Sequence, residues 1–282
     1  MKTNDPNFYL HFLCQIKPTL ILTAFLFFVL IFCDSEFSLR KLTFASDEVV
    51  KAKQAIRVLK LDNSATSDSE LIEIVSNNPE LVELTLGGTK ITDAGIDHLA
   101  QLKKLRKIRL SKTNITNAAG AKLAKIPTLQ DIDVSQTDFG DAGLEELKPL
   151  AKLKRLNLYL TNVTDTGAVK IKDFNSAKII TWLNLDLCQI SDAGAKSLLG
   201  IENLEWLHLG GTNVTDAALD DMIKFKKLNN IIVTKTSVTN PAAEKLRKNK
   251  PNCKVLDNVS ENITEEQIKQ AKEIRQKGIS NN

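Results

Sequence analysis

Histidine and cysteine, the side chains used most often for catalysis and metal binding, are few and widely spaced in this chain. The histidines are residues 11, 98 and 208, and the cysteines, at 14, 33, 188 and 253, include no CxxC pair. Zinc sites and disulfide frameworks need closer spacing, so neither is expected. His208 with Asp186 is a candidate acid–base pair, but no serine or cysteine nucleophile lies at an equivalent position nearby. The sequence therefore predicts no enzyme, no metal site and no cofactor.

The charges of the chain nearly cancel. Its 282 residues include 38 Lys and Arg and 34 Asp and Glu, giving a net charge of +4, with 43% hydrophobic residues. This composition is that of a folded protein. Nucleic-acid binders usually carry a basic patch or stripe, and this balance predicts none, so no nucleic-acid partner is expected.

The residues that carry chemistry must be positioned by a unit that repeats with a period near 24. One copy, from Leu81, reads LVELTLGGTKITDAGIDHLAQLKK. Further copies begin at Leu105, Leu129, Leu153, Ile180, Leu204 and Leu228. A degenerate copy begins at Ile56, and Cys253–Leu256 is the possible start of a ninth strand. The unit from Leu153 is longer by three residues near 173–178.

Each unit predicts one strand and one helix. Apolar residues at unit positions 1, 4 and 6 indicate a short strand with one buried face. Position 9 is threonine in most copies and Cys188 in one, a small side chain expected to satisfy backbone groups where the chain leaves the sheet. Thr/Ser-Asp/Asn pairs, such as Thr92-Asp93, predict the N-cap of a helix that buries positions 16, 19 and 22. Since no unit can bury both faces alone, the units must stack.

The pattern LxxLxLxxTx[IV]T[DN]xG resembles the leucine-rich repeat family, in the short TDAG form of exported bacterial members. The resemblance covers about residues 55–257. It implies an α/β fold, a right-handed solenoid or horseshoe with parallel strands on the concave face and helices outside. It also implies protein or glycan binding, although a fold alone does not establish function.

Both ends of the solenoid need covers. Residues 47–55 predict an N-terminal capping helix, so the repeat domain is expected to span 47–257. In the C-terminal segment, 258–282, Thr264 and Gln267 form a predicted capping box for a helix running to about Lys277. This helix is either a lid on the final repeat or a solvated tail.

Residues 1–46 differ from the rest and hold eight of the eleven phenylalanines. An uncharged run of fifteen residues, Thr19–Cys33, suits a signal anchor or a signal-peptide core. Cleavage, lipidation at Cys33, an uncleaved anchor and a buried core helix remain alternatives. The charges that flank the run predict that the bulk of the chain lies outside the cytoplasm, anchored to the membrane or secreted.

Unit positions 3, 5 and 7 should face outward on the concave side, because strand side chains alternate. Position 3 reads Glu83, Lys107, Asp131, Arg155, Trp182 and Trp206. The first four predict a ladder of ion pairs. The candidate partner-binding site comprises Trp182, Trp206, Tyr159, Asn157, Asn184, Asp186 and His208.

Paired tryptophans beside amides and a carboxylate are typical of interaction hot spots and of sugar-stacking platforms. We therefore expect a non-enzymatic module that binds a protein or a surface polymer. The alternative is a structural envelope protein or spacer with no dedicated ligand.

Overall fold

The computed structural model describes residues 56–277, in which nine strands form one parallel sheet in chain order. The strands are β1 (Val58–Lys60), β2 (Glu83–Thr85), β3 (Lys107–Arg109), β4 (Asp131–Asp133), β5 (Arg155–Asn157), β6 (Trp182–Asn184), β7 (Trp206–His208), β8 (Asn230–Ile232) and β9 (Lys254–Leu256). The expected ninth strand is therefore present. The predicted apolar segment and the helix at 47–55 lie outside the described residues. Among residues 56–277, no helix is long and apolar enough to cross a membrane.

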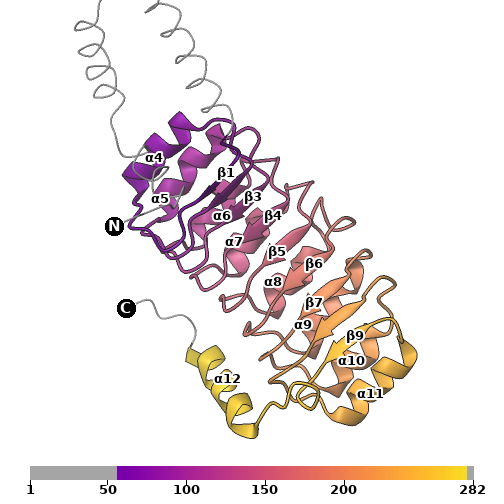
Figure 1. The fold of residues 1–282 in the computed structure, drawn as a ribbon. Helices are drawn as coiled ribbons and strands as arrows, with labels where there is room; N and C mark the ends of the chain where they lie inside the picture. Colours follow the sequence, from indigo (N-terminus) through magenta and orange to yellow (C-terminus); the bar gives the residue numbers. More distant parts are fainter. Residues whose placement is uncertain (1–55, 278–282) are drawn as a thin grey trace, which may run out of the picture. The chain divides into compact units, whose positions relative to one another are not determined.

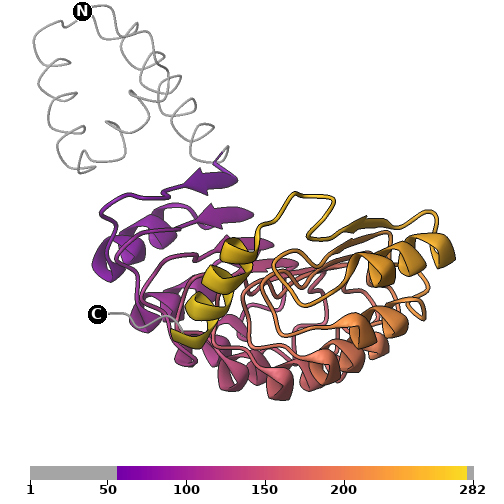
Figure 2. The same ribbon diagram turned by 90° about the horizontal axis from the view of Figure 1, so that it is seen from below.

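Helices alternate with the strands, as the repeat predicts. They are α4 (Asp68–Asn77), α5 (Asp93–Ile96), α6 (Ala118–Leu123), α7 (Asp141–Glu146), α8 (Asp165–Ile171), α9 (Asp192–Ser197), α10 (Asp216–Met222), α11 (Asn240–Asn249) and α12 (Glu265–Lys277). Two short 3₁₀ helices, η1 (Asp97–Gln101) and η2 (Leu198–Gly200), follow α5 and α9. Helices α4–α11 form a row along the sheet, and α12 lies apart from this row (Figures 1 and 2).

The core lies between the sheet and the helix row and is continuous along the repeats. In the unit from Leu81, Leu84 of β2 and Leu86 directly after this strand are fully buried. Ile96, Leu99 and Leu102, at positions 16, 19 and 22, are also fully buried. The periodicity therefore identifies the apolar face of both elements correctly.

The small residue at position 9 satisfies the backbone, as predicted. Thr137 is fully buried, and its hydroxyl donates to the carbonyl of Val134 at 2.6 Å. The same bond forms at Thr89, Thr113, Thr161, Thr212 and Thr236. The Cys188 thiol donates to the carbonyl of Leu158 in the preceding unit, with 3.0 Å between sulfur and oxygen. Burial raises the pKa of this thiol to about 11. Cys188 is therefore a structural residue.

A polar ladder joins most helix starts to the next; between α6 and α7 the Asn117 side chain accepts from the Gly140 N–H in its place. Thr164 caps α8, because its hydroxyl accepts from the Thr166 N–H at 3.1 Å. Asp141 of the preceding unit accepts both the N–H and the hydroxyl of Thr164, at 2.8 and 2.6 Å. Equivalent pairs are Asp68–Thr92, Asp93–Thr116, Asp165–Ser191, Asp192–Thr215 and Asp216–Thr239. The cap residues therefore bond adjacent units to each other as well as starting their own helices.

Gly167 makes room for this contact. A Cβ atom at this position would lie 2.3 Å from the Asp141 Oδ1 atom, well inside van der Waals contact. The glycine at unit position 15 thus allows the aspartate of one unit to approach the helix of the next.

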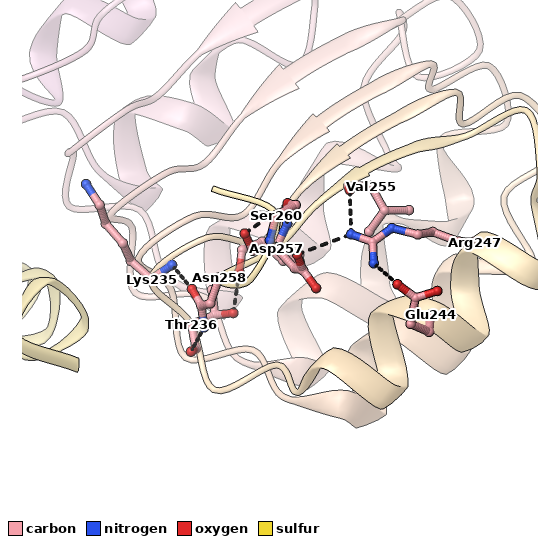
Figure 3. Close-up of polar contacts among 9 residues, drawn as sticks. Lys235, Thr236, Glu244, Arg247, Val255, Asp257, Asn258 and Ser260 are labelled. Atoms are coloured by element: carbon pink, nitrogen blue, oxygen red, sulfur yellow. Dashed lines mark hydrogen bonds and ion pairs between the residues drawn. The ribbon is translucent and has the colours of Figure 1, made fainter. Parts of the chain in front are cut away.

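A polar cap closes the C-terminal end of the core (Figure 3). Asp257 replaces the apolar residue of position 6 and is 1% exposed. Its carboxylate accepts from the Ser260 N–H at 2.8 Å and lies 3.2 Å from the Arg247 guanidinium. Asn258 bonds the backbone of Lys235 and Thr236 in the preceding unit.

Helix α12 begins with the predicted capping box, in which Thr264 and Gln267 bond each other's N–H groups at 2.9 and 3.2 Å. Most residues of α12 are exposed, and its buried face contacts an earlier unit than the final repeat. Arg275 donates to the carbonyl of Gly211, in the turn after β7, and is buried with Ala271 on the same face of the helix. The Arg247–Asp257 pair closes the last repeat, and α12 packs against the turn after β7.

Replacing Asp141 with alanine should lower the free energy of unfolding by about 1–3 kcal/mol, because the N–H and the hydroxyl of Thr164 both lose a charged acceptor. Chemical denaturation followed by circular dichroism measures the change. Asp173→Ala removes an exposed carboxylate with no side-chain bond in residues 56–277 and is the matched control. Equal effects of the two substitutions would show that the ladder does not join the units.

Candidate functional site

The three-residue strands present unit positions 3 and 5 on the face of the sheet away from the helices. Each strand pairs in step with the next, so equivalent residues of successive units lie side by side. The central residue of each strand from β2 to β9 is buried on the helix side, as Leu183 and Leu207 show, and Leu59 of β1 is partly buried. We call the outward surface the concave face.

The N-terminal half of the concave face is covered by ion pairs. Lys107 lies 3.1 Å from Glu83, and Arg155 lies 3.3 Å from Asp131. At position 5, Arg109 lies 3.5 Å from Asp133. The predicted ladder is therefore confirmed. Exposed pairs of this kind contribute about 0–1 kcal/mol each, so this half is a largely self-neutralised surface.

The C-terminal half begins with a stack of aromatic rings. Trp182 of β6 and Trp206 of β7 are paired in the sheet, and their ring centroids lie 4.3 Å apart with an interplanar angle of 7°. The guanidinium of Arg155 lies 4.4 Å from the centroid of the Trp182 ring. Arg155 therefore links the ion-pair ladder to the aromatic stack. Both tryptophans remain partly exposed.

This geometry decides which parts of the indoles can contact a ligand. One face of Trp182 is covered by Arg155 and the other by Trp206. A sugar ring stacks on an aromatic face, whereas protein side chains also pack against ring edges. Trp182 thus offers its edge, which favours contacts with a protein.

His208, Asn184 and Asp186 form a polar cluster beside the stack. The His208 Nδ1 atom lies 3.0 Å from the Asn184 Oδ1 atom and 3.6 Å from the Asp186 carboxylate. Burial, with a smaller effect of the Lys235 charge, lowers the pKa of His208 to about 4. Burial also raises the pKa of Asp186 to about 7, against the opposing effect of Lys235. Near pH 7 the imidazole is therefore neutral, and this contact is a hydrogen bond to the amide.

Asn157 and Asn184 are engaged with the backbone at the ends of their strands. The Asn157 side-chain oxygen accepts from the Tyr159 N–H at 3.2 Å, and that of Asn184 accepts from the Asp186 N–H at 2.9 Å. Asp133 makes the same turn with the Ser135 N–H at 3.0 Å. These amides therefore fix the residues that follow them. Tyr159 is partly buried, and burial raises the pKa of its hydroxyl.

All seven predicted residues thus lie together on β5, β6 and β7 or directly after these strands. Sequence reasoning missed the apolar continuation of the face, formed by Ile232 of β8 and Leu256 of β9, both partly exposed. The signal was available, because both residues occupy position 5, which holds polar residues in the other units. Within residues 56–277, no group of three or more His, Cys, Asp and Glu side chains is placed to hold a metal ion.

Comparison with family models matches three consecutive units to the model described as Leucine Rich repeat, at residues 125–148, 150–172 and 180–199. Comparison with curated proteins gives no match. The matched units include β5 and β6, which carry Arg155 and Trp182.

The gain in the free energy of unfolding caused by the substitution Asp186→Asn should be about 1–3 kcal/mol larger at pH 8.5 than at pH 5. A carboxyl whose folded-state pKa is raised favours folding below its unfolded-state pKa of 3.8, and this contribution is lost as the pH rises through about 7. The amide avoids ionisation in the buried site. Urea denaturation at both pH values measures the effect, and a gain of equal size at pH 5 would contradict this explanation.

Proposed function

The chain is a leucine-rich repeat protein, and from this premise we propose that it is a non-enzymatic interaction module whose concave face holds a protein partner. The observation that carries the proposal is the change in side-chain chemistry along the concave face. Ion pairs cover the strands up to β5. The tryptophan stack follows on β6 and β7, and partly exposed apolar residues lie beyond it. Interface hot spots are rich in tryptophan, tyrosine and arginine, all of which lie at this boundary.

The proposal of a protein partner over a surface polymer rests on the covered faces of Trp182. Trp182 has no open indole face on which a sugar could stack, whereas side chains of a protein can contact its ring edge and the neighbouring Tyr159. His208 and Asp186 support no catalytic role in this proposal, because the hydrogen bond to Asn184 holds the imidazole and burial disfavours its charged form.

We further propose that residues 19–33 anchor the chain to a membrane and that the repeats lie outside the cytoplasm. The support is the length of the uncharged run and the charges that flank it. The alternative function is that of a structural spacer in the envelope, for which the tryptophans would have no partner.

Replacing Trp182 and Trp206 together by alanine should weaken capture of the partner by at least about 30-fold, since hot-spot residues contribute about 2 kcal/mol or more. Partners are recovered on the immobilised full chain and identified by mass spectrometry. Because the protein has two tryptophans, both in the stack, their fluorescence reports binding at this site directly.

The matched control is Lys107→Ala, which removes a residue of the ion-pair half of the same face. Circular dichroism checks that each variant is folded. Equal capture by the folded double variant and by the native chain would place the site elsewhere. Recovery of no defined partner would favour the spacer.

The anchor predicts that the protein sediments with membranes and keeps its N-terminal segment. Mass spectrometry of the mature N-terminus in the membrane and soluble fractions measures this. A soluble chain that begins after residue 33 would show cleavage, and a lipid mass on Cys33 would show lipidation.

A further inference from the structure

The net charge of +4 conceals a basic region at the C-terminal end of the repeats. Residues 224–254 contain nine lysine and arginine residues and one acidic residue, Glu244. The expectation of no basic patch, made from the whole-chain balance, is therefore wrong for this part of the protein. Lys226, Lys227, Lys248 and Lys254 are exposed, and none of them forms an ion pair within residues 56–277.

Two residues of this basic region, Arg247 and Lys254, line a groove of about 580 Å³ on the last repeat. We call it the end groove. Asn240, Glu244 and Arg247, spaced by four and three residues along α11, form one wall. β9 contributes Lys254, Val255 and Leu256, and the loop at Val259 and Ser260 forms the opposite side. Val259 is 59% exposed, so the groove has an uncovered apolar lining.

The edge of β9 also offers backbone groups to this groove. The Lys254 N–H donates to Asn229, and the Leu256 carbonyl accepts from Val233, both at 2.8 Å, so these groups face β8. In a parallel pair alternate residues point to opposite sides, and the peptide groups of Val255 therefore point away from β8. The Val255 carbonyl accepts from Arg247 at 2.9 Å, while its N–H points to the open edge.

The walls of the end groove are held rigidly (Figure 3). Arg247 bonds Glu244 at 2.6 Å and lies 3.2 Å from Asp257, which fixes α11 against β9. Because Arg247 is engaged in this way, the lining charge free to meet a ligand is that of Lys254 on β9. Lys248 lies outside the lining but follows Arg247 on α11 and is exposed.

We propose that the end groove binds an acidic segment of a partner protein in extended conformation. The segment adds to the edge of β9, accepts the Val255 N–H with a backbone carbonyl, and places its carboxylates near Lys248 and Lys254. Strand addition of this kind takes its affinity from main-chain bonds and its specificity from alternate side chains. This site lies at the end of the solenoid and meets the concave face at Leu256, but it does not depend on a partner bound at the tryptophan stack.

Two other occupants agree less well with the groove. Single-stranded nucleic acid binds where aromatic side chains stack its bases, and the lining of the end groove contains no aromatic residue. A second copy would have to bring a folded unit to a groove that lies between α11 and the loop at Val259 and Ser260, whereas an extended segment presents a single strand to it.

The test is fluorescence anisotropy of a labelled octapeptide of alternating glutamate and threonine, titrated with the purified full chain. We expect saturable binding that weakens with added salt. Replacing glutamate by glutamine should weaken binding at least tenfold.

Lys248→Glu and Lys254→Glu should each weaken binding of the glutamate peptide at least tenfold. The matched control, Lys152→Glu, reverses an exposed lysine elsewhere on the repeats and should change the affinity less than twofold. Both groove substitutions alter exposed side chains with no ion pair to lose, and circular dichroism confirms folding.

Three results would overturn the proposal. The first is no binding up to about 1 mM peptide, a free energy weaker than about −4 kcal/mol. The second is a Lys152→Glu effect as large as that of Lys254→Glu. The third is displacement of the peptide by an oligothymidine, or by self-association of the chain seen in sedimentation. If that competing interaction is lost in the Lys254→Glu variant, it would identify a different occupant of the groove.

Discussion

The bond between the aspartate at the start of one helix and the threonine or serine that caps the next is the contact on which the solenoid depends. Apolar packing alone resists separation of the units but tolerates sliding, because it has little directionality. The Asp141 carboxylate instead accepts two donors of Thr164 at once, so it fixes the helix side of the junction, while strand pairing fixes the sheet side. A carboxylate near helix N-termini is also favoured by the unpaired N–H groups there.

This fixed spacing determines what lies on the concave face. Residues in equivalent positions become neighbours, and Trp182 therefore stacks on Trp206 and meets Arg155 on its other side. The unit between Arg155 and Trp182 has three extra residues, yet the two strands still pair in step. Phe174 and Ala177 from the extension are buried, so the extra length is folded into the core and the sheet is undisturbed.

Most of the fold could be predicted from the sequence, because each unit repeats the same local signals and errors do not accumulate. The strand positions, the buried face, the position 9 hydroxyl and the start of α12 are all local features. The ladder was foreseen only as a local N-cap, since nothing in the Thr164-Asp165 pair shows that Thr164 also bonds the preceding Asp141. The docking of Arg275 on Gly211 joins residues 64 apart and leaves no periodic signal.

The candidate site was predicted in membership but not in geometry. Alternation along the strands correctly grouped the two tryptophans with Tyr159 and His208. It could not show that the indole rings lie parallel, or that Asn157 and Asn184 turn their oxygens to the backbone. The orientation of the Trp182 ring depends on both of its neighbours, Trp206 on one face and Arg155 on the other. It is therefore set by three successive strands, β5 to β7, and not by the sequence of any one unit.

The distribution of charge leads to a wider conclusion about how this solenoid presents its surfaces. Residues 61–89 contain six acidic residues and no lysine or arginine, whereas residues 224–254 are strongly basic. Between them, the concave face pairs its charges across adjacent strands. In a compact domain these regions would lie close together and partly neutralise one another. In a stack of units the two ends stay apart by many strand spacings of about 4.8 Å, well beyond the screening length of about 8 Å in physiological salt. Each end therefore acts on its surroundings with its own sign, and the net charge of the whole chain describes neither.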